Sequence, residues 1–122
     1  GPFTVLGRDY PTPDGTAIRD YVHVSDLADA HVRALSHLLG GGASMALNLG
    51  TGIGTSVLDM LAAVRKATGR DVPHLFAPRR VGDPPILYAS PERAGKILGW
   101  RAHFTSIDAI VQTAANWLGT HA

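Results

Sequence analysis

Arginine, tyrosine and aspartate side chains in two short segments carry the most chemistry in this sequence. Arg19 and Tyr21 lie two residues apart in a segment that alternates apolar and polar residues from 18 to 24. In an extended segment their side chains point to the same face. A guanidinium beside a phenol suits a diphosphate and a neighbouring ribose or sugar hydroxyl. The alternative is that Arg19 forms an ion pair with Asp20 or with another surface acid.

The second segment is a loop in which Arg79, Arg80 and Asp83 surround Gly82. Loops often carry binding groups, because a rigid scaffold can aim their side chains. Two cations and a carboxylate in such a loop could therefore bind a ligand. The alternative is a solvated turn with a local arginine–aspartate pair, which contributes little free energy. For Arg79 a structural role is also considered.

A third segment contains closely spaced glycines after a possible strand and before a helix. Gly50, Gly52 and Gly54 follow one another at every second position, and Asp71 lies further along the chain. A dinucleotide-binding turn has the spacing Gly-x-Gly-x-x-Gly, and its acidic residue ends a strand, whereas Asp71 precedes one. We therefore interpret the glycines as a tight turn that lets the helix approach the sheet, and we expect no NAD at this turn.

Composition excludes several classes of function. The chain has 122 residues, 45% of them hydrophobic, a formal net charge of +1 and no cysteine. The balanced charge gives no reason to expect nucleic acid or an anionic membrane as a partner, and the missing cysteines exclude disulfides and thiolate metal sites. The six histidines form no metal-binding motif. Without a long apolar run or a signal-peptide pattern, the expectation is a cytoplasmic protein.

The elements that must position these residues follow from hydrophobic spacing and from turn residues. Short strands are predicted at residues 3–6, 46–49, 74–77 and 86–89, with an extended segment at 18–24. Four helices are predicted: from Ser25 to the glycines at 40–42, from Thr55 or Ser56 to Gly69, from Ser90 and Pro91 to Gly99, and from Thr105 or Ser106 onward.

The hydrophobic faces of these helices provide the predicted core. The first helix has one face at helical spacing, and the last helix is expected to bury a similar face that ends in Trp117 and Leu118. Trp100 and Trp117 are both interpreted as core anchors. The fold class is therefore α/β, with few short strands and four helices. So few strands make a small sheet, which indicates a missing partner half or association with another copy.

Several motifs in order along the chain carry a resemblance to a known family. They are YPTPDGT at residues 10–16, RDYVHVSD at 19–26, NLGTG at 48–52, PRRVGD at 78–83 and LGW at 98–100. Together they resemble the C-terminal, sugar-nucleotide-binding part of UDP-glucose 4-epimerases, which are extended short-chain dehydrogenases of the Rossmann type. The first motif separates these epimerases from most relatives, whereas the second is shared with other nucleotide-sugar enzymes.

The resemblance implies a set of substrate-binding residues. Arg19 and Arg80 would contact the diphosphate of a UDP-sugar. Tyr21 would lie beside the nucleotide, and Asp83 would bind the ribose hydroxyls. The uracil ring would be read mainly by backbone groups of the strand that contains Thr4 and Leu6. Residues 1–122 would form one UDP-sugar-binding portion.

The catalytic residues of the family have no counterpart in this chain. The family transfers hydride between the sugar and tightly held NAD, and it needs a Tyr-x-x-x-Lys pair. The lysines at 66 and 96 have Ala62 and Glu92 four residues before them. We therefore expect no catalytic residue and no cofactor on this chain, with NAD bound by a missing N-terminal part, and no turnover by the chain alone.

The expected function is thus the UDP-sugar-binding part of a UDP-glucose 4-epimerase in galactose metabolism. Its expected partners are a UDP-sugar, the missing N-terminal half of the enzyme and a second copy of the chain in a homo-oligomer. One alternative is a related NAD-dependent epimerase or decarboxylase that acts on another UDP-sugar. The other alternative is a truncated interaction module without catalytic function.

Overall fold

The computed structural model describes residues 1–121, which form four helices and five short strands. In chain order these are β1 (Phe3–Leu6), β2 (Ile18–Arg19), α1 (Val24–Leu39), β3 (Thr55–Ser56), α2 (Val57–Thr68), β4 (His74–Ala77), β5 (Ile86–Leu87), α3 (Glu92–Leu98) and α4 (Ile107–His121). The predicted α/β class with four helices and few short strands is confirmed. No helix within the described residues is long and apolar enough to cross a membrane.

The strands form two small sheets. In the first, β1 and β4 pair in parallel, with Phe3 opposite His74 and Leu6 opposite Ala77. In the second, the order is β3-β2-β5, and β2 runs antiparallel to β3 and parallel to β5. Arg19 is the last residue of the central strand of this second sheet. The second sheet therefore holds one end of the segment that carries the candidate binding residues.

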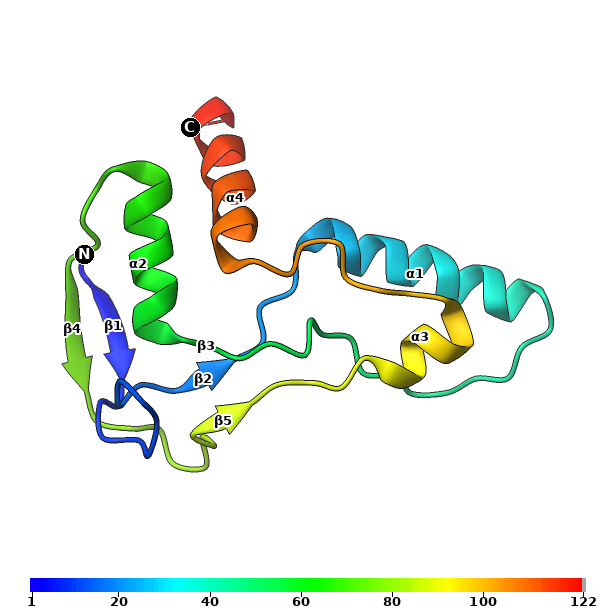
Figure 1. Cartoon of the computed structure of the whole chain (residues 1–122), viewed down its shortest axis with the longest axis horizontal. Helices are drawn as coiled ribbons and strands as arrows, with labels where there is room; N and C mark the ends of the chain where they lie inside the picture. Colours follow the sequence, from blue (N-terminus) through cyan, green and yellow to red (C-terminus); the bar gives the residue numbers. More distant parts are fainter. Residues whose placement is uncertain (122) are drawn as a thin grey trace.

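The helices lie at two ends of an elongated molecule (Figure 1). At one end α2 packs against α4, close to the β1–β4 pair, and at the other end α1 packs against α3. The β3-β2-β5 sheet lies between these two ends. Since so little sheet is available, each helix pair has its own small hydrophobic contact rather than a common core.

The largest buried side chain is Trp100, which has no exposed surface. It packs between Ala30 of α1 and Ala94 of α3, with Leu47 and Leu49 at the edge of the cluster. The indole Nε1 donates a 2.8 Å hydrogen bond to the backbone carbonyl of Asp26. Burial and this hydrogen bond together confirm Trp100 as a core anchor, because a buried indole N–H needs an acceptor.

The first helix begins one residue earlier than its predicted cap. The N-cap is His23 rather than Ser25, and its Nδ1 accepts a 3.0 Å hydrogen bond from the backbone N–H of Ser25. An imidazole nitrogen therefore takes the role that a serine oxygen plays in most caps. The predicted N-cap Ser56 of α2 and the C-cap glycines of α2 and α3, Gly69 and Gly99, are confirmed.

Two other local predictions are wrong. Residues 46–49 form no strand, because no neighbouring strand within the described residues pairs with them. At the start of α3 the N-cap position is Pro91, which makes no side-chain hydrogen bond, so Ser90 does not cap this helix. The strand predicted at 86–89 is shorter and covers only Ile86–Leu87.

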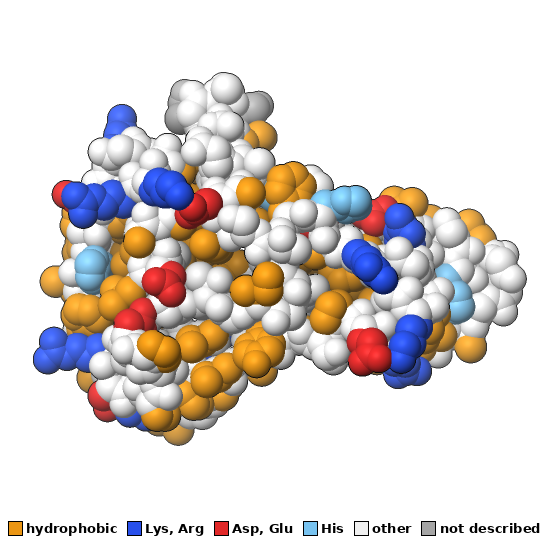
Figure 2. Space-filling model, viewed as in Figure 1, with side chains coloured by type: hydrophobic (Ala, Val, Ile, Leu, Met, Phe, Trp, Pro, Cys, Tyr) orange, Lys and Arg blue, Asp and Glu red, His pale blue; other side chains and the backbone are white. Residues whose placement is uncertain are grey.

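Large parts of the predicted hydrophobic faces are exposed. On α4, Val111 is buried, but Trp117 and Leu118 keep 60% and 59% of their surface exposed. Trp117 is therefore not a core anchor, because more than half of its surface stays exposed. Of the hydrophobic residues of α1 only Ala30 is buried, whereas Leu35 and Leu38 are exposed on the same helix. Figure 2 also shows hydrophobic side chains at the surface around β4 and β5.

Candidate functional site

Arg19 connects the end of β2 to the loop between β4 and β5. Its Nη1 donates hydrogen bonds to the carbonyl oxygens of Ile18, at 2.8 Å, and of Pro84, at 3.0 Å. No ion pair joins Arg19 to an acid among residues 1–121. The alternative pairing with Asp20 is therefore wrong. One nitrogen of the guanidinium holds the loop, and the rest of the group can bind a ligand.

Tyr21 is half-buried beside Arg19. Burial raises the pKa of the Tyr21 phenol above its usual value of 10.0, and the positive charge of Arg19 acts in the opposite direction. The phenol therefore keeps its proton at neutral pH and can donate a hydrogen bond. That Arg19 and Tyr21 share one face of the segment stays a prediction.

Asp20 faces the opposite side and binds the glycine-rich turn. Its Oδ1 accepts from the backbone N–H and the hydroxyl of Thr51, at 3.0 and 2.6 Å, and its Oδ2 accepts from the N–H of Gly52 at 3.0 Å. A Cβ on Gly50 would lie 2.5 Å from Oδ2, so only glycine fits there. The glycines are a tight turn, as predicted. A pyrophosphate would need the N–H groups that Asp20 already occupies, so the turn does not fit NAD.

Arg80 and Asp83 form an ion pair with each other at the tip of the loop. The distance from Arg80 Nε to Asp83 Oδ2 is 2.9 Å, and 68% of the Arg80 side chain is exposed against 25% for Asp83. Gly82, with a φ of 86°, allows the tight turn between them. The local pair considered from the sequence is therefore present. Because exposed pairs contribute about 0–1 kcal/mol, a ligand can replace it at small cost.

Arg79 holds the other end of the same loop. Its Nε lies 2.7 Å from Asp9 Oδ1, and its guanidinium lies 4.5 Å from the centre of the buried Tyr10 ring. The hydrogen bond from Arg79 holds the pKa of Asp9 below its usual value. Arg79 therefore has the structural role that the sequence left open. The loop is thus held at one end by the Arg79–Asp9 ion pair and at the other by the hydrogen bond from Arg19 to Pro84. Arg80 and Asp83 lie between these two contacts.

The strand that contains Thr4 and Leu6 ends next to this loop. Thr4 lies opposite Leu75 and Leu6 opposite Ala77, which is the last residue before the loop. Only one edge of β1 pairs with a strand among the described residues. The other edge therefore offers backbone groups without a strand partner, and their contact with a base remains a prediction.

A shallow hollow of about 540 Å³ lies at the carboxyl ends of β1 and β4. It is lined by Arg8, Asp9, Phe76, Ala77 and Pro78, and Arg8 lies over the Phe76 ring at 5.5 Å. Ligands of open α/β sheets bind outside the carboxyl ends of parallel strands. The sequence reasoning missed this group, because the pairing that joins Arg8 to Phe76 links residues 68 positions apart in the chain.

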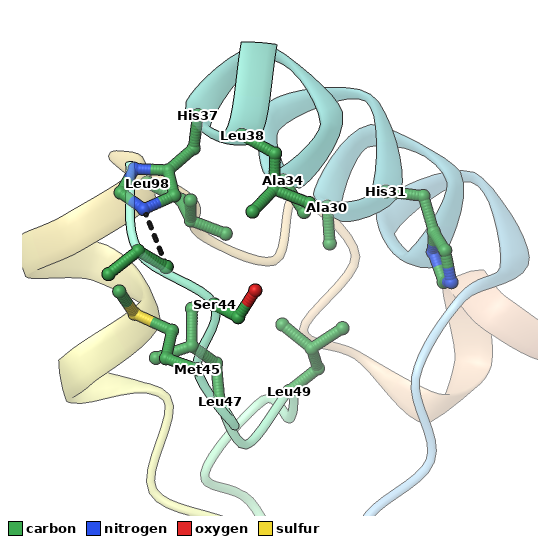
Figure 3. A pocket seen from close by; sticks show the side chains of 11 residues that line it. Ala30, His31, Ala34, His37, Leu38, Ser44, Met45, Leu47, Leu49 and Leu98 are labelled. Atoms are coloured by element: carbon green, nitrogen blue, oxygen red, sulfur yellow. Dashed lines mark hydrogen bonds between the residues drawn. The ribbon is translucent and has the colours of Figure 1, made fainter. Parts of the chain in front are cut away.

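A second hollow, about 360 Å³ in volume, is apolar and lies between α1 and residues 43–49 (Figure 3). His31 and His37 lie at its edge, and His37 Nε2 is 3.3 Å from the carbonyl oxygen of Ala43. Among residues 1–121 no cluster of three possible metal ligands occurs. None of the candidate binding residues lines this groove.

Comparison with known proteins identifies the relatives of the chain. Residues 1–50 match the NAD dependent epimerase/dehydratase family. The chain is 52% identical over 117 residues to a UDP-glucose 4-epimerase of Lacticaseibacillus casei, covering 96% of the chain and 35% of that relative.

Solved structures give the same result. The Brucella ovis UDP-glucose 4-epimerase in complex with NAD matches with a TM-score of 0.88 and 49% identity, over 97% of this chain and 36% of that one. The Bifidobacterium longum UDP-glucose 4-epimerase in complex with NAD+ and UDP matches with a TM-score of 0.84 and 42% identity, over 96% and 34%. The chain thus spans about a third of the length of these relatives. Over nearly all of its own length it is similar in sequence and in structure to these UDP-glucose 4-epimerases.

Proposed function

We propose that this chain is the C-terminal, UDP-sugar-binding part of an NAD-dependent UDP-glucose 4-epimerase. The observation that carries the proposal is the hydrogen bond from Arg19 to Pro84, which joins β2 to the loop of Arg80 and Asp83. It connects the two arginine segments that are far apart in the sequence, within a fold that matches solved epimerases closely. The whole enzyme interconverts UDP-galactose and UDP-glucose in the galactose metabolism of the cytoplasm.

The binding roles follow from the charges and the exposure of the site. Arg19 and Arg80 bind the diphosphate, because two guanidinium groups can offset its charge through paired hydrogen bonds. Asp83 leaves its ion pair and accepts hydrogen bonds from the ribose hydroxyls. Tyr21 lies beside the nucleotide and donates through its phenol. The open edge of β1, with Thr4 and Leu6, contacts the uracil through backbone groups.

The chemical step belongs to the part of the enzyme outside this chain. NAD supplies the hydride acceptor and donor when it is bound there, and no residue of this chain has a catalytic role. The glycine-rich turn supports this division, because the N–H groups of Thr51 and Gly52 are taken by Asp20. This chain therefore binds and orients the UDP moiety and shows no turnover by itself.

The exposed apolar surface supports a larger assembly. The chain exposes 8036 Å², whereas a compact monomer of its mass exposes about 6,300 Å². The excess of roughly 1,700 Å² on this one chain is about twice the ~800 Å² that each partner buries in a standard protein interface. Apolar side chains that include Leu35, Leu38 and Met45 are exposed on α1 and the segment beside it. We assign this face and the groove in Figure 3 to the rest of the epimerase, with a second copy of the chain as the competing occupant.

A chimera tests the proposal. The chain replaces the corresponding third of the Brucella ovis epimerase, and conversion of UDP-galactose to UDP-glucose is measured for the chimera and for the chain alone. We expect turnover by the chimera and none by the chain. A folded chimera that binds NAD but has no activity and no affinity for UDP would refute the proposal, and turnover by the chain alone would refute the division of roles. Conversion of a different UDP-sugar would instead support the sibling epimerase or decarboxylase.

Arginine substitutions in the chimera test the binding roles. Arg19→Ala and Arg80→Ala should each weaken UDP binding by about 1.5–3 kcal/mol, the contribution of hydrogen bonds to charged groups. Arg70→Ala removes the same charge from an exposed position at the far end of α2 and is the matched control. Isothermal titration with UDP measures the three variants. Equal affinities for all of them would show that these arginines do not bind the diphosphate.

A further inference from the structure

Asp20 lies between two proposed substrate-binding residues but points away from them. Side chains alternate along an extended segment, so Arg19 and Tyr21 share one face and Asp20 occupies the other. The carboxylate accepts three hydrogen bonds from the turn within the NLGTG motif: two from Thr51 and one from Gly52. The two oxygens are thus both engaged, at distances of 2.6 to 3.0 Å.

The segment that Asp20 holds is anchored at its far end by the buried His23, whose Nε2 lies 2.8 Å from the Thr113 hydroxyl, and at its near end by Asp20. The strand β2 ends at Arg19, and α1 begins at Val24, so residues 20–23 belong to neither a strand nor a helix. The fit on the turn is close, since a Cβ on Gly50 would lie 2.5 Å from the carboxylate. Hydrogen bonds to an ionised carboxylate are shorter and stronger than neutral ones. The clamp is therefore the contact that fixes this segment just after Arg19.

We propose that Asp20 is a positioning residue: by clamping its segment onto the turn at Thr51 and Gly52, it sets the direction in which Arg19 and Tyr21 face the UDP moiety. The inference rests on the proposed function, because it assumes that these two side chains bind UDP. It assigns to Asp20 no contact with the substrate.

A pure charge effect of Asp20 and a positioning role of Asp20 predict opposite changes in UDP affinity. A carboxylate next to Arg19 repels an anionic ligand, so if only its charge mattered, Asp20→Asn would strengthen UDP binding. If its position matters, Asp20→Asn weakens binding, because an amide nitrogen faces a donor N–H of the turn. Asp20→Glu keeps the charge but adds a methylene group, which moves the carboxylate away from the position at which it accepts from Thr51 and Gly52. The positioning role therefore predicts a loss in both variants.

Isothermal titration of the folded chain with UDP distinguishes these cases. We expect Asp20→Asn and Asp20→Glu each to weaken UDP binding about tenfold, the effect of one charged hydrogen bond. Asp29→Asn removes the same charge from the exposed surface of α1 and should leave the affinity unchanged. In an Arg19→Ala background, Asp20→Asn should have a much smaller effect, because Asp20 acts through Arg19. Tighter binding by Asp20→Asn, or an equal loss in both backgrounds, would overturn the inference.

A measurement without ligand separates this inference from the proposed function. If the unmodified chain binds no UDP, its proposed binding role fails, and nuclear magnetic resonance then decides on Asp20. Thermal unfolding first checks that the Asp20→Asn variant is folded. In the folded variant, the side-chain N–H signal of Arg19 and the ring signals of Tyr21 should shift or broaden. In Asp29→Asn they should not. Unchanged signals of Arg19 and Tyr21 in a folded Asp20→Asn variant would show that Asp20 does not position them.

Discussion

The buried carboxylate of Asp26 gives the sharpest prediction about stability. Asp26 is 2% exposed in the first turn of α1. Its Oδ1 accepts from the backbone N–H of His103 at 3.1 Å, and its Oδ2 accepts from that of Phe104 at 3.0 Å. These bonds tie α1 to the segment between α3 and α4. Asp26→Ala removes both acceptors and leaves two backbone N–H groups without a protein partner.

The expected magnitude follows from these two bonds. Hydrogen bonds to a charged group contribute about 1.5–3 kcal/mol each, and an acidic residue in the first turn of a helix adds about 0.3–1 kcal/mol. Allowing for partial solvation of the freed N–H groups, Asp26→Ala should lower the free energy of unfolding by about 3–5 kcal/mol. Asp26→Asn keeps one acceptor oxygen and should lower it by about half as much. A loss of this size is a large part of the stability of an ordinary domain.

Urea unfolding followed by circular dichroism measures both variants. The matched control is Asp29→Ala, three residues along α1, where an exposed carboxylate pairs with Arg33 at 2.8 Å. Such a pair contributes about 0.3–0.5 kcal/mol. The reasoning predicts a shift of the urea midpoint for Asp26→Ala several times larger than for Asp29→Ala. Equal shifts for the two variants would refute the role of Asp26 as the link between α1 and the segment before α4.

Two further predictions concern the loop of the YPTPDGT motif. Burial acts to raise the pKa of Asp14, but hydrogen bonds, first that from Ser56, outweigh it and hold the pKa below 3.8. The stability from this lowered pKa is present above the ordinary value and is lost as the pH falls through the folded value, below about pH 4; urea titrations should show a smaller acid loss in Asp14→Asn. At Gly15, with a φ of 80°, a Cβ would lie 2.2 Å from the Arg8 carbonyl oxygen. Gly15→Ala should therefore lower the melting temperature far more than Gly41→Ala, which has a similar φ and open space; equal shifts would contradict the clash.

Local chemistry made most of the fold predictable. The α2 boundaries follow from Ser56, whose hydroxyl accepts from the N–H of Asp59, and from Gly69 in the left-handed region. These signals depend on neighbours within a few residues, so they act in any surroundings. The wrong predictions concern features that depend on contacts with distant parts of the chain. A strand at residues 46–49 would need a neighbouring strand, and none within the described residues pairs with them. The burial of Trp117 likewise depends on tertiary packing, and 60% of its surface stays exposed.

The candidate site, too, has features that the sequence predicts and features that depend on distant contacts. The residue types in the motifs and the period of the extended segment predict Arg19 and Tyr21 on one face. The ion pair of Arg80 with Asp83 was an open alternative, since a three-residue spacing in a loop allows pairing and separation equally. The partner of Asp20 was not predictable, because Thr51 and Gly52 lie more than thirty positions away.

The sequence by itself determined the turns, the caps of α2 and the side chains available for binding a diphosphate. Those features depend on local backbone sterics and on the chemistry of single residues. Only the tertiary structure decided how these side chains are held. It turned Asp20 away from Arg19 towards the glycine-rich turn, placed Arg79 on Asp9 and Tyr10, and joined Arg19 to the carbonyl of Pro84. Each of these contacts joins segments that are distant in the chain, and their geometry depends on how the strands pair.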